Sequence, residues 1–314
     1  MKKIWIRTLA SLSALCLTLI FPHTAMAQAG EKILQFPNDY SVGRIYILKP
    51  NRPPDDRSTL TPKFFEARGT LKLNPKLRLS LEANYQLVEH CEILRALPPD
   101  SFDQMSLAKL PIQNKDLNNL THFTKLVRLD LNDSDITDGG IKFLLTLHDL
   151  QYLNLSHTLI SAKNIGILQA LPHLQNLDLN HVDLSGTDLA GLPALKDLRY
   201  VHFSNCCLTD AAVTNVAKLS MLENVSLPGN LNVSGASFRK MAACKHLVKL
   251  DVSGTKVTAK DLEALKGLNL NCIELRQEQG DVNTRARLHA LFPRAVLMIK
   301  SETRLPTELF RPLH

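Results

Sequence analysis

The sequence lacks the short motifs that carry common enzymatic chemistry. It contains no G-x-S-x-G nucleophile turn, no glycine-rich phosphate loop and no H-E-x-x-H zinc site. Ser226, His202 and Asp178 are the residue types of a hydrolase triad, but columns of polar residues produce such trios by chance, and spacing alone does not position a general base. The sequence therefore predicts a protein that is not an enzyme, without catalytic residues or a cofactor.

Runs of like charge are also absent. The formal net charge is +7, and Lys2, Lys3 and Arg7 supply three of these charges in a segment that we expect to be removed, which leaves about +4. Acidic and basic residues are interspersed, without the Lys/Arg-rich run of a nucleic-acid or anionic-membrane footprint. This pattern predicts that the partner is not a nucleic acid.

Cysteine is scarce. Of six cysteines, Cys16 falls in the leading segment, and the others form no C-x-x-C zinc pair. Cys206 and Cys244 take apolar positions of the repeat described below, so we expect them to be buried. The sequence does not determine whether Cys91, Cys207 or Cys272 forms a disulfide. A bond between Cys207 and Cys272 is excluded, because these residues would lie about three strand spacings apart, which is beyond disulfide reach.

Long apolar runs are missing after the first 27 residues. Residues 1–27 combine a basic start, an apolar stretch and Ala25-Met26-Ala27, which is an A-x-A cleavage site. No later segment approaches the ~18 apolar residues of a membrane-spanning helix. We therefore expect a signal peptide over 1–27 and export to the periplasm, the extracellular space or the cell surface of a bacterium. The mature chain should have no transmembrane segment.

What the sequence does contain is a repeat. The phrase L-x-x-L-x-L, with conservative replacements, returns at intervals of 24 residues, with one interval of 25 and one of 23. Its copies begin at Phe102, Leu126, Leu150, Leu174, Leu198, Leu222, Leu247 and Leu270. A fixed period in the twenties with this phrase is typical of a leucine-rich repeat solenoid.

Each copy also carries a second apolar rhythm, of period three. Ile141, Leu144 and Leu147 illustrate it in one copy, and Ile165, Leu168 and Leu171 in the next. The L-x-L phrase predicts a short strand and the period-three row a short helix, and neither buries its apolar face alone. Stacked units therefore predict an α/β solenoid, a right-handed curved horseshoe with parallel strands inside and short helices outside.

The turn after each strand strengthens this interpretation. Residues 130–141 read DLNDSDITDGGI, and residues 251–258 read DVSGTKVT. These stretches resemble the L-D-L-S-x-T-x-I-T-D-x-G-L repeat of exported bacterial leucine-rich repeat proteins, and the resemblance covers roughly residues 100 to 300. It implies the solenoid fold and a binding role, and it is silent on the ligand.

The flanking regions differ from the repeats. Residues 41–48, 69–73 and 77–81 are predicted strands, and 49–62 is a predicted exposed loop, so 28–83 should form a small β cap over the first repeat. A single helix is expected over 84–97, with Leu87, Leu94 and Leu97 inward. The repeat domain should span 84–300, ending in a helix whose apolar stripe is shortened to Leu288 and Leu291 and in a strand over 295–299, before a tail at 301–314.

Two polar columns should line the inner face. The residue between the two strand leucines gives Asp130, Asn154, Asp178, His202, Ser226, Asp251 and Glu274. The adjacent column supplies most of the predicted partner-binding residues. The full predicted set is Arg128, Tyr152, Asn176, Tyr200, His202 and Lys249. Tyrosine and arginine often anchor protein interfaces, so we expect this face to bind a protein partner.

A third column offers secondary candidates for a metal site. Asp133, His157 and His181 follow successive strands and should stack about one strand spacing apart. Imidazole and carboxylate both bind zinc or copper, but solvated turn residues explain the column more simply, and no metal site is predicted.

The sequence thus favours an exported, non-enzymatic binding protein. The alternative is a structural envelope or surface-layer component whose repeats self-associate. The identity of the partner and the oligomeric state are not determined by the sequence.

Overall fold

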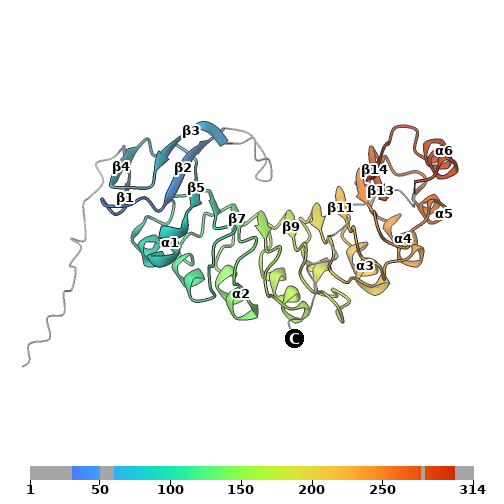
Figure 1. Cartoon of the computed structure of the whole chain (residues 1–314), viewed down its shortest axis with the longest axis horizontal. Coiled ribbons are helices and arrows are strands. Elements are labelled where there is room, and N and C mark those ends of the chain that lie inside the picture. Colours follow the sequence, from blue (N-terminus) through green and yellow to red (C-terminus); the bar gives the residue numbers. More distant parts are fainter. Residues whose placement is uncertain (1–29, 50–59, 277–279, 301–314) are drawn as a thin grey trace, which may run out of the picture.

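A computed structural model describes residues 30–49, 60–276 and 280–300. The repeats stack into an arc whose strands line the inner, concave side and whose helices lie on the outer side (Figure 1). The fold is the predicted α/β solenoid with a long sheet of parallel strands and short helices. The expected signal peptide at 1–27 and the tail at 301–314 lie outside the described residues. No helix within these ranges is long and apolar enough to cross a membrane.

The main sheet has twelve strands. Ten of them run parallel in chain order: β5 (Leu79–Ala83), β6 (Gln104–Ser106), β7 (Arg128–Asp130), β8 (Tyr152–Asn154), β9 (Asn176–Asp178), β10 (Tyr200–His202), β11 (Asn224–Ser226), β12 (Lys249–Asp251), β13 (Cys272–Arg276) and β14 (Val296–Lys300). The middle residue of each repeat strand is apolar and pairs in register with the next, as Leu153 pairs with Leu129 and Leu177. These middle residues are fully buried from Leu129 to Ile273, and they form the spine of one continuous core.

The outer side combines α-helices with 3₁₀-helices. The α-helices are α1 (Tyr85–Glu89), α2 (Asp138–Leu144), α3 (Asp210–Val216), α4 (Gly235–Met241), α5 (Ala259–Leu262) and α6 (Val282–Leu291). The 3₁₀-helices are η2 (Cys91–Ala96), η3 (Asp116–Asn119), η4 (Ala162–Ala170), η5 (Leu192–Ala194) and η6 (Glu263–Leu265). The period-three rows are buried as expected, and where the helix is 3₁₀ the period equals its three residues per turn.

The turn after each strand is held in one unusual conformation. Its second residue has a positive φ, between 53° and 73°, in seven successive units. These residues are Lys109, Asp133, His157, His181, Asn205, Gly229 and Gly254. Glycine, asparagine and aspartate accept this left-handed region most readily, which explains most of the column without any ligand. At Gly229 a Cβ would also meet the end of the Asn205 side chain, which would have to shift.

The N-terminal segment extends the sheet. β2 (Gly43–Leu48) pairs antiparallel with β5 on one side and with β3 (Leu60–Glu66) on the other, and β1 (Lys32–Gln35) pairs with β4 (Thr70–Leu73) in a separate two-stranded sheet. The predicted strands over 41–48, 69–73 and 77–81 are confirmed by β2, β4 and β5. The parallel stack already starts at β5, inside the 28–83 segment.

Two sequence predictions were wrong in detail. The loop expected over 49–62 ends earlier, because Leu60 already begins β3; residues 50–59 lie outside the described ranges. The single helix over 84–97 is broken at His90, where φ is −134°, and the His90 ring stacks on Tyr40 with centroids 4.9 Å apart. Leu87, Leu94 and Leu97 are nevertheless buried.

The C-terminal end follows the expected pattern. The shortened stripe lies on α6, where Leu288 is buried and Leu291 packs partly buried against the core; α6 has ten residues, and at its start Asp281 Oδ1 accepts a hydrogen bond from Thr284 N. The final strand is confirmed: Ile273 of β13 pairs with Leu297 of β14, and Leu275 pairs with Ile299.

The leucines buried within and directly after each repeat strand should contribute much of the free energy of unfolding. Replacing Leu177 or Leu179 by Ala should cost about 2–5 kcal/mol, because both side chains are fully buried. Urea unfolding followed by circular dichroism measures this cost. The matched control is Leu159→Ala, whose side chain is 70% exposed and whose loss should change stability little. Equal midpoints for Leu177→Ala and Leu159→Ala would contradict the packing described here.

Candidate functional site

The concave face carries two rows of side chains that run across all twelve strands. We call the first the tyrosine row: Phe64, Tyr46, Ser80, Gln104, Arg128, Tyr152, Asn176, Tyr200, Asn224, Lys249, Cys272 and Val296. The second is the carboxylate row: Glu66, Arg44, Glu82, Ser106, Asp130, Asn154, Asp178, His202, Ser226, Asp251, Glu274 and Met298. From β5 to β14, register brings together residues that lie 23 to 25 positions apart in the chain.

Both polar columns expected from the repeats are present in these rows. Five of the six predicted binding residues lie in the tyrosine row, and His202 lies in the carboxylate row. Sequence reasoning missed the extension of both rows onto β2 and β3, because the N-terminal strands do not carry the repeat phrase. At that end the face is hollowed between Arg44, Glu66 and Glu82.

Arg128 and Tyr152 form a prearranged pair. The Arg128 guanidinium carbon lies 3.3 Å from the centroid of the Tyr152 ring, and Arg128 Nη2 lies 3.9 Å from Asp130 Oδ2. The stack leaves Tyr152 only 8% exposed, and burial raises the pKa of its hydroxyl. The sequence predicted Tyr152 as an open contact residue, whereas most of its ring is covered by the chain itself.

The Tyr200 side chain is held by Glu223, which directly precedes β11. Its hydroxyl donates to Glu223 Oε2 at 2.8 Å, and Arg199 Nη1 donates to Glu223 Oε1 at 2.5 Å. Burial raises the pKa of Glu223, but the hydrogen bonds from Arg199 and Tyr200 outweigh it and bring the pKa below its ordinary value. The half-buried Tyr200 ring is therefore held in one orientation.

Two amides next to Tyr200 leave an acceptor unused. Asn176 and Asn224 flank Tyr200 in register, and their Oδ1 atoms are buried without a hydrogen-bond partner among the described residues. A buried unsatisfied acceptor costs about 1–3 kcal/mol. The cost falls in the middle of the predicted binding residues.

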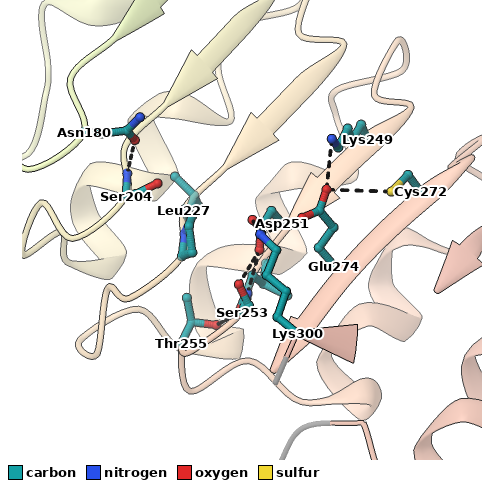
Figure 2. A network of polar contacts seen from close by, with 12 residues as sticks. Asn180, Ser204, Leu227, Lys249, Asp251, Ser253, Thr255, Cys272, Glu274 and Lys300 are labelled. Carbon is teal, nitrogen blue, oxygen red and sulfur yellow. Dashed lines mark hydrogen bonds and ion pairs between the residues drawn. The ribbon is translucent and has the colours of Figure 1, made fainter. Parts of the chain in front are cut away.

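At the C-terminal end of the face, the two acidic side chains Asp251 and Glu274 are paired with lysines (Figure 2). Lys249 Nζ lies 2.9 Å from Glu274 Oε1, and Lys300 Nζ lies 2.6 Å from both Glu274 Oε2 and Asp251 Oδ2. Burial raises the pKa of Glu274, but hydrogen bonds from Lys300 and Lys249 prevail and lower it. Lys249, a predicted contact residue, is thus engaged within the protein, and its bond to Glu274 raises its pKa. Nothing in the repeat pattern pointed to Lys300.

The metal candidates do not converge. The His157 and His181 rings stack with centroids 4.2 Å apart and planes 17° from parallel. A metal binds in the plane of an imidazole, so two stacked rings direct their nitrogens past each other rather than toward one ion. No group of three or more His, Cys, Asp or Glu side chains placed to hold a metal occurs among the residues described.

The trio of Ser226, His202 and Asp178 does lie side by side on three strands. Asp178, however, accepts hydrogen bonds from the Ser156 hydroxyl and from Asn180 N at 3.2 Å. Asp178 is therefore hydrogen-bonded to the end of its own strand and to the preceding repeat.

The described thiols fall into two groups. All five are free, and Cys91, Cys206 and Cys244 are buried. Burial raises the pKa of the Cys206 thiol to about 12 and those of Cys91 and Cys244 to about 11, so these thiols stay protonated. Cys207 is exposed, and Cys272 is half-buried on the concave face.

Comparison with known proteins identifies the repeats. A family model described as Leucine Rich repeat matches residues 122–145 and 243–266. No curated protein matches the chain.

Several solved structures are similar in fold. An internalin C2 of Listeria monocytogenes is 21% identical over 68% of this chain and 92% of its own, with a TM-score of 0.47. A second Listeria monocytogenes internalin, inlF, is 16% identical over 74% of this chain and 86% of its own, with a TM-score of 0.38. The ectodomain of the Arabidopsis receptor kinase HAESA, in complex with an IDA peptide hormone, is 18% identical over 59% of this chain and 36% of its own, with a TM-score of 0.44. These values are low, so the solenoid rests on the register and burial given above.

The histidine stack should make stability depend on pH. Burial and the neighbouring His157 imidazole lower the pKa of His181. The unfolded chain, with a histidine pKa of about 6.5, then binds the proton more tightly than the folded protein, so stability should fall as the pH drops through that value. His181→Asn keeps a residue that accepts positive φ, and it should lose less stability between pH 7.5 and pH 5.5, which are about one unit either side of that pKa.

Urea midpoints measured across this pH range test the prediction. The control is His173→Asn, which removes an exposed imidazole that lies 3.7 Å from Asp197 on another turn. Identical pH slopes for His181→Asn and the unsubstituted protein would show that the stack does not contribute.

Proposed function

We propose that this protein is an exported, non-enzymatic leucine-rich repeat protein that binds a protein partner through its concave sheet face. The observation that supports this proposal most is the run of Arg128, Tyr152, Asn176 and Tyr200 on four adjacent strands. These side chains are scattered over 73 residues of sequence, from 128 to 200, and register gathers them into one patch.

The geometry of the patch suits binding. Arg128 is stacked on Tyr152 and Tyr200 is anchored to Glu223, so little side-chain entropy remains to be lost when a partner docks. Tyrosine and arginine combine apolar area with directional hydrogen bonding, which is why they dominate interface energetics. A rigid sheet also holds the spacing of the contacts.

The charged groups on the face also favour binding over catalysis. Asp251 and Glu274 are neutralised by Lys300 and Lys249, and the lowered pKa of Glu274 makes it a poor general base near neutral pH. For export, the support is the segment at 1–27, with its basic start, apolar stretch and A-x-A site. The periplasm, the extracellular space and the cell surface are all compatible with it.

The test begins with affinity capture from a native cell-envelope fraction. Tyr152→Ala combined with Tyr200→Ala should weaken binding of the captured protein by about 2 kcal/mol or more, because Tyr200 is a contact residue at the centre of the patch and Tyr152 holds the Arg128 guanidinium that lies over its ring. Surface plasmon resonance measures the affinity, and thermal unfolding verifies that the variant is folded.

The matched control is Tyr85→Ala on α1, a tyrosine that is 57% exposed away from the sheet face. It should bind the partner as the unsubstituted protein does. Equal affinity for the double variant would move the binding site to the outer helices or to the N-terminal strands. Tyr200→Ala alone replaces the double variant if loss of the Tyr152 stack destabilises the fold.

A structural, self-associating role is the second candidate, and the two edges of the sheet favour it. β3 exposes Phe64 and Phe65, and β14 exposes Val296 and Met298. Strand edges of this kind can pair with another chain. Pro62 and Lys63 on β3 are, however, residue types that discourage such pairing, so we place this role second.

Sedimentation of the mature protein at rising concentration separates the two roles. If the edges drive assembly, the protein should form oligomers at micromolar concentration, and Val296→Lys with Met298→Lys should return it to the monomer. A monomer at all concentrations would exclude the structural role and leave the binding role standing.

A further inference from the structure

We propose that the arc has a bending point between two of its central repeats, the unit of residues 150–173, which contains β8, and the unit of residues 174–197, which contains β9. The strands form the fixed side of this junction, and the outer segments, which carry the helices, form its yielding side. β9 lies near the middle of the arc (Figure 1). The inference concerns the free protein, so it holds whether or not the concave face binds a partner.

On the strand side, this junction is bonded like its neighbours. β8 and β9 pair in parallel over three register pairs. In the turn that follows, His157 N donates to Asn180 O at 2.9 Å, and at the next junction His181 N donates to Ser204 O at 2.8 Å. The sheet and its turns therefore hold the two units at a fixed spacing.

At the neighbouring junctions the outer segments are bonded to each other as well. The recurring form is an acceptor at the first helical position of one unit that caps the helix start of the next. Asp138 accepts from Ser161 N and Ser161 Oγ, both at 2.7 Å, and Asp210 accepts from Ser234 N at 2.8 Å. Between residues 110 and 268, the other junctions are bonded by the pairs Asn114–Thr137, Asp138–Ser161, Asp188–Asn215, Asp210–Ser234 and Val233–Lys256.

The junction between the outer segments 158–172 and 182–196 lacks such a bond. Its first helical position is Ala162, which offers no side-chain acceptor to Ser185 in the next unit. Ser185 N donates instead to Asp183 Oδ1 at 2.9 Å, within its own turn. All residues of the two segments are described, and no hydrogen bond joins one segment to the other.

Apolar packing and one close backbone contact hold these outer segments together. A Cβ added at Gly191 would lie 2.8 Å from Gly166 Cα, so the two backbones meet without side chains between them. The helices on the two sides, η4 and η5, are 3₁₀-helices, in which hydrogen-bond geometry is poorer than in α-helices. The ion pair of His173 with Asp197 lies close in sequence to β9 and β10 and needs a protonated imidazole. Apolar attraction is non-directional, so it keeps the segments in contact without fixing their angle.

The weakest junction determines where a solenoid bends, because each unit contacts only its neighbours. With bonded strands and outer segments held by packing, this junction should open and close on its outer side, with the sheet as the hinge line. Arg128 and Tyr152 lie on one side of the junction, and Asn176 and Tyr200 lie on the other. Bending here therefore changes the curvature of the predicted binding patch.

Distances between spin labels on the outer side measure the bend in the mature protein. Cys207→Ser and Cys272→Ser remove the accessible thiols, and the three buried thiols stay protonated. The first label pair, at Lys142→Cys and Ala211→Cys, spans the proposed bending point. The second pair, at Ala211→Cys and His289→Cys, spans as many junctions without it, and all three positions are exposed. Double electron–electron resonance should give a broader distance distribution for the first pair.

A charge-neutral exchange of two residues tests the cause. Ala162→Asp combined with Asp183→Ala moves the acceptor for Ser185 from its own turn to the preceding unit, as at the neighbouring junctions. The double variant should narrow the distribution of the first pair to the width of the second. It should also slow amide exchange in residues 162–170 by about fivefold, the factor that an ordinary helix cap gives. Asp183→Ala alone removes the acceptor without replacing it, so it should not narrow the distribution.

Equal widths for the two label pairs would overturn the bending point. A folded double variant whose first-pair distribution is as broad as before would overturn it as well. If thermal unfolding shows that the double variant is not folded, Asp138→Ala takes its place. This substitution loosens the preceding junction and should broaden the first-pair distribution, and an unchanged width would contradict the inference. The binding role is tested separately, with the captured partner and the tyrosine double variant.

Discussion

The structure depends on one packing constraint: each repeat strand places one apolar side chain directly on that of the next strand. Leu129, Leu153, Leu177, Val201 and Val225 form this column, and all are fully buried. Burying one such side chain contributes about 1.5–3 kcal/mol, and a repeat cannot bury it alone. In-register stacking follows, and with it the positions of all other residues on the sheet.

Register converts a sequence period into a surface. A shift of one residue would turn the apolar column toward solvent, so the alignment of the strands is strongly specified. The flanking residues, such as Arg128 and Asp130, must then point to the concave side and line up with their counterparts 24 positions away. The same stacking aligns the turns, where the column of positive φ values recurs at each unit. The polar rows are a consequence of the core and not a separate feature of the fold.

This relation explains what the sequence could and could not reveal. The strands, the buried leucines and the two polar columns of the repeats follow from period and alternation, and all are present. The stacking of Arg128 on Tyr152 and the reach of Lys300 to Asp251 depend on rotamers of long side chains, which periodicity does not encode. The strand status of residues 60–62 was missed because Pro62 argues for a loop, and an edge strand tolerates proline.

A buried side chain can also escape notice because its residue type varies among the units. Asn230 is fully buried, and its Oδ1 accepts from Cys206 N at 3.1 Å and Leu208 N at 2.9 Å; the equivalent position is Ser134, Thr158 or Thr255 in three other units and Val182 or Cys206 in two. The Asn230 amide thus forms hydrogen bonds with two repeats at once. The hydroxyls of Ser134 and Thr158 each bond within their own turn.

The polar groups of the concave face are paired at its C-terminal end and on β7, and less completely between them. At its C-terminal end Lys249 and Lys300 neutralise the acids, and on β7 Arg128 pairs with Asp130. Between them, Asn176 and Asn224 leave acceptors unused, at about 1–3 kcal/mol each. A long apolar core tolerates that cost, since each fully buried strand residue contributes a comparable amount. A solenoid of this kind can therefore keep a few incompletely satisfied polar groups at the centre of its face without endangering the fold that positions them.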